Sequence, residues 1–325
     1  MITYLLHSAR TILFHSLVIF FLLMTGLQWH GAPKVARADQ PTKISAQVSG
    51  AFINYYVRPD GSDSNDGSAS HAFLSIQHAA NLAVPGATVH VASGIYPGGI
   101  TTNISGTASA RIRFVSDEKW GAKVMADGTS GIWSNHGSYI DIDGFEITGR
   151  SNQGILNYGS FVRILNNYVH DIQIECPSSG SGIDHANYSA TDNDTIGNVV
   201  QRIAPDPSCE SDHGPGIYHA TLRGTIVNNI VSYAREGIHL WHAADAVTIS
   251  GNVLLHNRTA GILIGAGDAP GGVIADNCIV STNTSAYNKF GIREFGNTGK
   301  HNKYLNNKVY GNITNWLLQN GNSPH

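Results

Sequence analysis

Titratable side chains gather in the middle of this 325-residue chain, mostly between residues 184 and 242. The members of this cluster are Asp184, His185, Asp212, His213, Tyr218, His219, Glu236, His239 and His242. His transfers protons near neutral pH, Tyr is a second proton carrier, and a carboxylate can orient a His or hold a cation. A single His on a strand is most often a hydrogen-bonded structural residue, but a cluster of this size favours a catalytic site.

Most of these residues follow a repeated Gly-Ile pair, and such a repeat is typical of a repeat protein. The pairs begin at Gly131, Gly154, Gly182, Gly216, Gly237, Gly261 and Gly291. Between most neighbouring pairs an apolar segment ends in Asn, as at Asn167, Asn229, Asn252, Asn277 and Asn307. Successive pairs are 23, 28, 34, 21, 24 and 30 residues apart. The shorter spacings fit one three-strand coil of a solenoid, and the excess in the longer ones predicts loops.

The residue after each Gly-Ile pair is expected to face outward if the Ile faces the core, because side chains alternate along a strand. This outer row comprises Trp133, Leu156, Asp184, Tyr218, His239, Leu263 and Arg293. Strands of neighbouring coils lie about 5 Å apart, so Asp184, Tyr218 and His239 should form a contiguous ladder. By the same alternation His185 and His219 face inward, unless the strand has already turned at that point.

The N-terminal segment predicts export. Arg10 precedes an apolar run over residues 12–27, and Ala36-Arg37-Ala38 offers a small-residue cleavage site. We expect a signal peptide over residues 1–38, a linker over 39–52 and a single domain over 53–325. A single membrane anchor is the alternative for the leader, but the apolar run is short for a membrane span and a cleavage signal follows it. No later segment is apolar enough to cross a bilayer.

The charge composition indicates which classes of partner the exported chain can bind. Without the leader, acidic residues outnumber basic ones by six. A mildly acidic protein with few Lys is a poor candidate for binding nucleic acid. We expect a secreted monomer without stable membrane insertion.

The cysteines support a braced loop. Cys176 lies six residues before Gly182, and Cys209 lies seven residues before Gly216, so both hold nearly the same place in consecutive coils. Because an exported chain allows disulfides, we predict a Cys176–Cys209 bond. Cys278 lies in an apolar run and is expected to be a buried free thiol.

Three N-terminal segments, together with the Gly-Ile and Asn repeats, resemble secreted right-handed parallel β-helix proteins of the pectate-lyase-like superfamily. The segments are residues 55–63, 76–80 and 94–96. The resemblance covers about residues 53–312 and implies an all-β, right-handed parallel β-helix. It also implies an Asn ladder between second and third strands and a substrate groove along the first strands. Residues 76–83, with Ser75 as cap, predict a short helix that covers the first coil.

The superfamily contains polysaccharide lyases, glycoside hydrolases, uronate epimerases and non-catalytic surface proteins, so the fold does not fix the reaction. β-Elimination needs a base for the proton beside the uronate carboxylate and a cation or an Arg to neutralise it. No Lys occurs between Lys123 and Lys289, which excludes a Lys base in the central coils. A His or Tyr base remains, with Arg293, Arg223 or Arg235 near the carboxylate.

We therefore favour a polysaccharide lyase acting on a uronate polymer, and keep a glycoside hydrolase or a non-catalytic carbohydrate-binding protein as alternatives. The predicted catalytic residues are Asp184, His185, Tyr218, His219, His239 and Arg293. The predicted substrate-binding residues are Trp133, Trp241, His213, His242 and Arg235. The candidate Ca²⁺ ligands, which are also the carboxylates available for hydrolysis, are Asp184, Asp212 and Glu236. Convergence of Asp184, His219 and His239 in one hydrogen-bond network would favour an enzyme.

Overall fold

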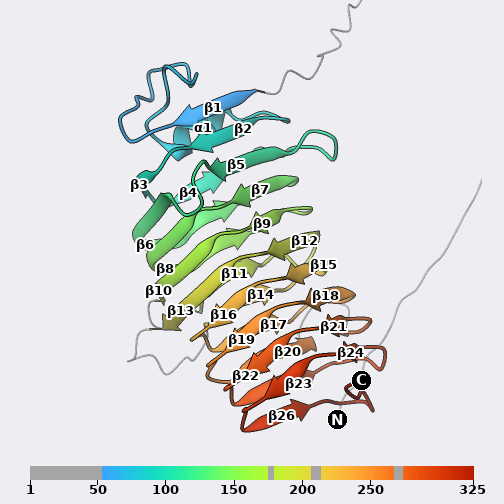
Figure 1. Ribbon diagram of the computed structural model, residues 1–325. Helices are drawn as coiled ribbons and strands as arrows, with labels where there is room; N and C mark the ends of the chain where they lie inside the picture. The colour runs from blue at the N-terminus through green and yellow to red at the C-terminus, as the bar shows by residue number, and fades with distance from the viewer. Residues whose placement is uncertain (1–52, 175–178, 206–213, 267–273) are drawn as a thin grey trace, which may run out of the picture. The chain divides into compact units, whose positions relative to one another are not determined.

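The structure, a computed structural model, describes residues 53–174, 179–205, 214–266 and 274–325. Its named strands pair in parallel and stack coil upon coil from the N-terminal to the C-terminal end (Figure 1). The predicted parallel β-helix is confirmed. The leader, the linker and the Cys176–Cys209 pair lie outside the described residues and stay predictions.

Each regular coil contributes three strands. Second strands form one sheet: β1 (Asn54–Val57), β2 (Thr88–Val91), β5 (Ile112–Ser116), β7 (Ile140–Asp143), β9 (Arg163–Leu165), β12 (Thr191–Ile196), β15 (Leu222–Val227), β18 (Val247–Ser250), β21 (Ile279–Ser281) and β24 (Lys303–Leu305). Third strands form one arm of the other sheet: β10 (Tyr168–Ile174), β13 (Val199–Pro205), β16 (Ile230–Ser232), β19 (Val253–Leu255), β22 (Thr284–Ala286) and β25 (Lys308–Tyr310).

First strands form the other arm of that second sheet, and all of them except the last carry the Ile of a Gly-Ile pair. They are β11 (Ser181–His185), β14 (Ile217–His219), β17 (Glu236–Leu240), β20 (Ala260–Ala266), β23 (Phe290–Gly296) and β26 (Thr314–Leu317). The long strands β6 (Ala122–Asn135) and β8 (Glu146–Asn157) link the two arms, and β6 also pairs with β3 (Gly94–Pro97) and β4 (Ile100–Thr102).

The Gly-Ile repeat sets the register of the first strands. The repeated Ile residues pair directly between coils and are fully buried: Ile155, Ile183, Ile217, Ile238, Ile262 and Ile292. Each coil therefore stacks its apolar side on the next, as expected for a solenoid. The same pairing places the following residues side by side, so the outer row is confirmed from Leu156 to Arg293.

The pair at Gly131 departs from this register. A shift in the β6–β8 pairing just before it sets Trp133, rather than Ile132, opposite Ile155. Trp133 is therefore fully buried and packs edge-on against Phe114, with 5.3 Å between ring centroids. The prediction that Trp133 faces outward to bind substrate is wrong, because the shift moves it into the core position of the repeat.

An Asn ladder runs between the second and third strands, as predicted. Its members are Asn167, Asn198, Asn229, Asn252, Asn283 and Asn307. Each side-chain oxygen after the first accepts hydrogen bonds from the backbone and side-chain nitrogens of the ladder Asn in the preceding coil, at 2.8–3.1 Å. Asn277 lies before its second strand and is not a member of the ladder, so that part of the prediction is wrong.

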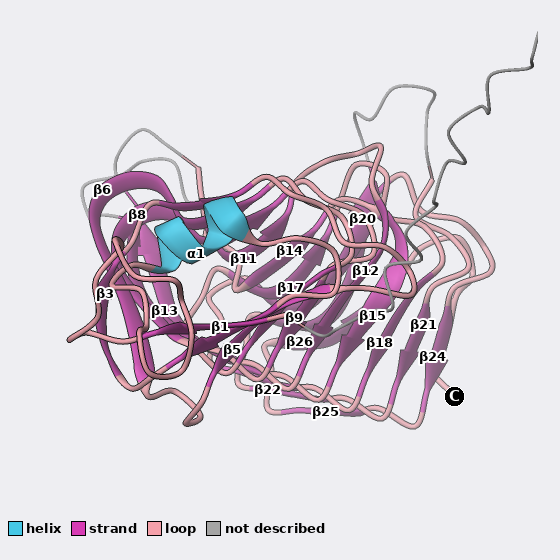
Figure 2. Ribbon diagram, turned by 90° about the horizontal axis from the view of Figure 1, so that it is seen from above, coloured by secondary structure: helices cyan, strands magenta, loops and turns pink. Residues whose placement is uncertain are grey.

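A helix covers the N-terminal end of the stack. In α1 (Ile76–Leu82), Ser75 is the N-cap and its hydroxyl accepts a hydrogen bond from the His78 backbone nitrogen at 3.1 Å. Ile76, Ala79 and Ala80 are buried, and Figure 2 shows the helix across the end of the first coils. The predicted capping helix is confirmed, and it shields an apolar cross-section that the first coil would otherwise expose.

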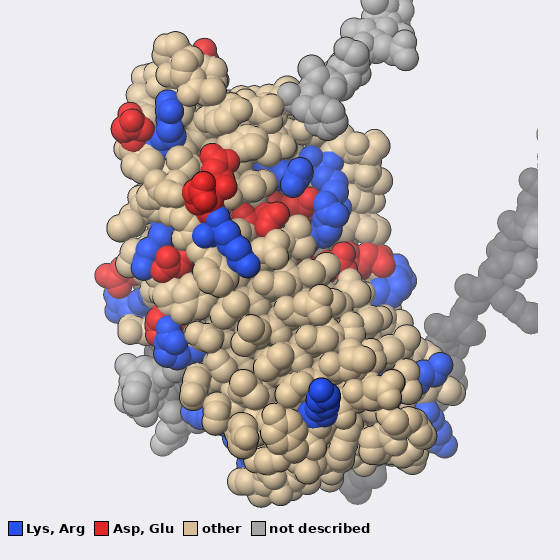
Figure 3. Space-filling view, viewed as in Figure 1, with Lys and Arg blue, Asp and Glu red and all other residues tan. Residues whose placement is uncertain are grey.

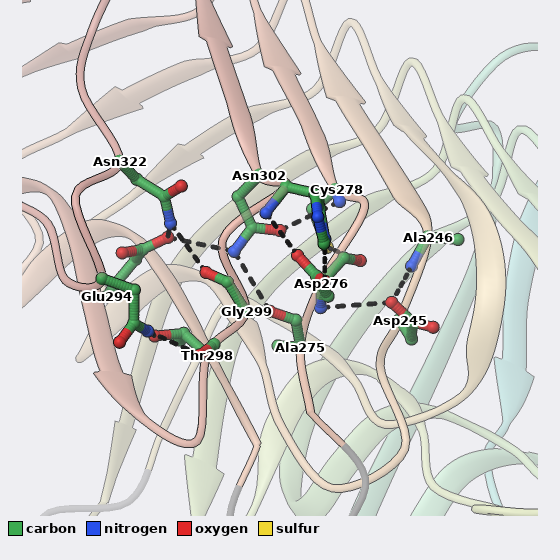
Figure 4. Close-up of polar contacts among 12 residues, drawn as sticks. Asp245, Ala246, Ala275, Asp276, Cys278, Glu294, Thr298, Gly299, Asn302 and Asn322 are labelled. Carbon is green, nitrogen blue, oxygen red and sulfur yellow. Dashed lines mark hydrogen bonds and ion pairs between the residues drawn. The ribbon is translucent and has the colours of Figure 1, made fainter.

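Buried Glu294 fastens the C-terminal segment to the last coils. It accepts hydrogen bonds from Tyr304 at 2.7 Å, Asn302 at 3.0 Å and Asn322 at 2.8 Å. The backbone nitrogen of Gln319 donates to its other oxygen at 2.6 Å. Figure 4 shows Asn302 and Asn322 directed toward this carboxylate. The charge is thus buried with four donors, which is the condition under which a carboxylate is tolerated in a core.

On the side of the molecule drawn in Figure 3, most of the charged residues lie in the N-terminal half, and a few Lys or Arg lie in the C-terminal half. In the N-terminal half, Asp141, with a side chain 2% exposed, pairs with Arg111 at 2.6 Å and with Arg163. These pairs tie neighbouring coils together. Cys278 is a buried free thiol, as predicted. Within the described ranges, no helix has the length and apolar character needed to cross a membrane.

Candidate active site

A cavity of about 630 Å³ opens along the first strands of the central coils. Eight of the predicted site residues line it: Asp184, Tyr218, Arg235, Glu236, His239, Trp241, His242 and Arg293. Direct strand pairing places Asp184 beside Tyr218, and Tyr218 beside His239. The predicted ladder is confirmed, and it forms one wall of the cavity.

A His–Tyr pair lies at the centre of this cavity. The ring of Tyr218 meets that of His239 edge to face, with 5.1 Å between centroids and 88° between planes. His239 Nδ1 lies 3.8 Å from Oε2 of Glu236, which is 1% exposed. The other oxygen of Glu236 accepts hydrogen bonds from Arg235 and Thr259, both at 2.7 Å. A carboxylate held in this way can stabilise positive charge on His239 when the imidazole takes up a proton.

Asp184 marks the N-terminal end of the cavity. Its side chain is nearly buried, and Ser181 donates a hydrogen bond to Oδ2 at 3.1 Å. Oδ1 is buried and has no hydrogen-bond partner among the described residues. Burial raises the pKa of Asp184 to about 7, and the hydrogen bonds from Ser181 and Gln153 offset only part of that increase. Asp184 therefore changes its charge near neutral pH.

Aromatic rings form the C-terminal end. Trp241 and Phe295 stack with 6.0 Å between centroids and 20° between planes. The indole lies against two glycines of the next coils: a Cβ on Gly265 would come within 2.6 Å of its ring, and one on Gly296 within 2.9 Å. Only glycine leaves room for the ring there. The guanidinium carbon of Arg293 lies 4.5 Å from the centre of the Phe295 ring, a cation–π contact.

Tyr188 and His242 form a second aromatic pair on the cavity wall. Their rings stack at 4.0 Å, and the Tyr188 hydroxyl lies 2.8 Å from His242 Nε2. His242 was predicted as a substrate-binding residue, whereas Tyr188 and Phe295 were not predicted. Tyr188 lies in the turn after β11, outside the repeated positions, so periodicity carries no signal for it.

His185 and His219 do not line the cavity. Both are fully buried inside the coil, where their rings lie 5.2 Å apart. Asn157 meets His185 Nδ1 at 3.0 Å, and His219 Nε2 lies 3.0 Å from the backbone oxygen of Arg223. Burial lowers the pKa of both, that of His219 to about 4. Their placement in the catalytic set needs correction, because alternation along the strand holds them on the inner face.

The expected convergence of Asp184, His219 and His239 in one hydrogen-bond network is therefore not met: Asp184 and His239 line the same cavity, whereas His219 is buried inside the coil. Asp212 and His213 lie outside the described residues. Within the described part of the chain, no cluster of three or more His, Cys, Asp or Glu is placed to hold a metal ion. The Ca²⁺ site stays a prediction.

Comparison with known proteins bears on the fold. No family model matches the sequence. The uncharacterized protein YwoF of Bacillus subtilis (strain 168) is 25% identical over 267 residues, which cover 76% of this chain and 50% of YwoF. The chain thus spans about half the length of this curated relative.

Three solved structures superpose on most of the chain. Pectate lyase Pel9A gives a TM-score of 0.57 at 18% identity and covers 83% of this chain and 79% of its own. A rhamnogalacturonan lyase gives 0.57 at 16% identity, covering 78% and 73%. The alginate lyase from Paenibacillus sp. str. FPU-7 gives 0.52 at 18% identity, covering 76% and 95%. The chain has the parallel β-helix fold of these lyases. At such identities the likeness extends to the fold and no further.

Proposed function

We propose that this chain is a polysaccharide lyase that cleaves a uronate-containing polymer by β-elimination. The observation that carries the proposal is the cavity along the first strands, where Tyr218 lies directly beside His239 and Arg293 lies two coils beyond His239, with Leu263 between them. The shared fold with pectate, rhamnogalacturonan and alginate lyases supports carbohydrate chemistry of this kind.

In the proposed reaction, Arg293 binds the carboxylate of a uronate ring and stabilises the charge that develops when the adjacent C5 proton leaves. His239 takes that proton, and the freed electron pair forms the C4–C5 double bond. The bond from C4 to the glycosidic oxygen breaks, and Tyr218 gives its proton to the leaving oxygen. Glu236 lies beside His239 and stabilises the imidazolium that results.

The positive charge available to the substrate comes from Arg293. The other guanidinium in the cavity, Arg235, donates a hydrogen bond to Glu236 at 2.7 Å, so its charge is largely compensated. Arg293 instead makes ring contacts, and no carboxylate within the described ranges pairs with it. A uronate carboxylate would therefore supply the counter-ion that the described residues do not provide for Arg293.

The experiment is a screen of the purified protein against uronate polymers, following the ultraviolet absorbance of the unsaturated product with and without a chelator. Product formation supports the lyase proposal, and its loss on chelation would support the predicted Ca²⁺. Secretion, removal of residues 1–38 and a monomeric state belong to the same proposal and rest on the sequence.

A glycoside hydrolase is the second candidate, because two cavity carboxylates have contrasting surroundings. Asp184 has its pKa raised to about 7 by burial, as suits a general acid, whereas Glu236 accepts a hydrogen bond from the Arg235 guanidinium, as suits an ionised partner. This reaction releases reducing ends without an unsaturated product. New reducing ends in the absence of ultraviolet absorbance would therefore replace the lyase assignment with hydrolysis.

A further inference from the structure

The two ends of the cavity differ in charge. From Asp184 on β11 to Arg293 on β23 the outer row crosses four strand steps, a span of about 19 Å. An acidic side chain lies at one end of this span and a basic side chain at the other. A polymer laid along the cavity therefore meets two different electrostatic environments.

The Asp184 end suits an uncharged sugar. Oδ1 of Asp184 is buried against the cavity and has no partner in the described part of the chain, so it can accept a hydrogen bond from a ligand hydroxyl. The neighbouring cavity residues Gln153 and Ser181 are polar and uncharged. A carboxylate at this end would face the ionised Asp184, and no cation beside Asp184 among the described residues compensates the repulsion.

The Arg293 end suits a uronate. The guanidinium carbon lies 4.9 Å from the centre of the Phe290 ring and 4.5 Å from that of Phe295, which fix its position without neutralising its charge. Beside it, Trp241 packs against Gly265 and is only partly buried. A flat aromatic face suits the apolar face of a sugar ring.

We propose that the substrate is an alternating polymer, in which a neutral sugar binds at the Asp184 end and a uronate binds at the Arg293 end. A polyuronate carries a carboxylate on every ring and would bring one of them to Asp184. The inference rests on the proposed lyase function and names its substrate class. It agrees with the elimination step, because the ring that leaves with the glycosidic oxygen needs no carboxylate.

The test compares kcat/KM at pH 8 on two alternating polymers, rhamnogalacturonan and hyaluronan, with that on two polyuronates, polygalacturonate and alginate. We expect at least one alternating polymer to be preferred by about tenfold or more. This is the size of the repulsion between two unscreened like charges about 10 Å apart. Equal or faster cleavage of a polyuronate would overturn the inference and leave the lyase proposal intact. Absence of unsaturated product from all four polymers would refute the lyase proposal instead.

The Asp184→Asn variant tests the cause of the preference. It keeps the shape of the side chain and removes its charge, so the ratio of alternating-polymer to polyuronate kcat/KM should fall about tenfold. The matched control is Asp192→Asn, which makes the same change in net charge at a residue paired with Arg223 on the second-strand face. That control should leave the ratio unchanged. A ratio unaffected by Asp184→Asn would overturn the assignment of this end.

Binding separates this inference from catalysis. In the His239→Ala background, calorimetric titration with short oligosaccharides measures affinity without turnover. Alternating oligosaccharides should bind more tightly than oligouronates, and Asp184→Asn should narrow that difference. Tighter binding of oligouronates would overturn the inference even if every polymer resists cleavage.

Discussion

Replacing His219 by Asn should make the stability of the protein less sensitive to acid. His219 ends an inner polar column in which Asn135 donates to Asn157 at 2.7 Å, and Asn157 meets His185 at 3.0 Å. Direct strand pairing then sets His185 beside His219. Asn is thus already the residue type of the first rungs of this column, so His219→Asn keeps its polar character and removes one titrating group.

The magnitude follows from the pKa of His219, which burial lowers from 6.5 to about 4. Between these values the unfolded chain binds a proton that the folded chain does not. Stability from this group is therefore complete above pH 6.5 and is lost as the pH falls toward 4. Linkage gives a loss of about 2 kcal/mol between pH 8 and pH 5 for this one group. His219→Asn should remove the part of this stability loss that comes from His219, whereas the part that comes from His185 should remain.

The assay is urea unfolding of both proteins at pH 8 and pH 5. The substitution also loses the bond to the Arg223 backbone oxygen, so we expect a cost of about 1–2 kcal/mol at either pH. The test is the difference in the free energy of unfolding between pH 8 and pH 5, which should be smaller by about 2 kcal/mol in the variant. An unchanged difference would refute the assignment of His219 as a buried neutral residue. Loss of activity without loss of folding would return it to the catalytic set.

Three further outcomes are expected. His239→Ala should lower kcat by about 10²–10⁴-fold, as measured from the unsaturated product, and full activity in this variant would remove His239 as proton acceptor. Asn229→Ala removes four buried hydrogen bonds and should cost about 4 kcal/mol in urea unfolding. Asn228→Gly, at an exposed residue with φ of 57°, should cost less than about 1 kcal/mol. Thiol titration of the unfolded, unreduced protein should find one free thiol, whereas three would refute the Cys176–Cys209 bond.

The repeated positions were predictable from the sequence because a solenoid applies one rule to every coil. Alternation along the strand placed Asp184, Tyr218 and His239 on the outer face, and the pairing of the first strands puts them side by side. Trp133 escaped the rule because a register shift within β6 moves its side chain to the core. Sequence spacing gives no sign of such a shift.

Residues outside the repeat were harder to predict. Phe295 stands two residues beyond the outer row and joins the site only because Trp241 reaches across two coils to stack on it. Tyr188 depends on the path of a turn. For His185 and His219, alternation along the strand already predicted that the side chains face inward. The sequence did not show whether each strand continues that far. The burial of both residues settles that point.

Arg293 and Glu294 are neighbours in sequence that face opposite sides of β23. One contributes to the cavity, and the other binds Gln319 and Asn322 of the C-terminal segment. Proteolytic trimming before Gln319 would remove two of the four hydrogen-bond donors of this buried carboxylate, and losing donors to a buried carboxylate is destabilising. The backbone of β23 would be the first element to relax, and Arg293 would move with it. Cleavage of the C-terminal segment should therefore weaken binding of the proposed uronate at Arg293.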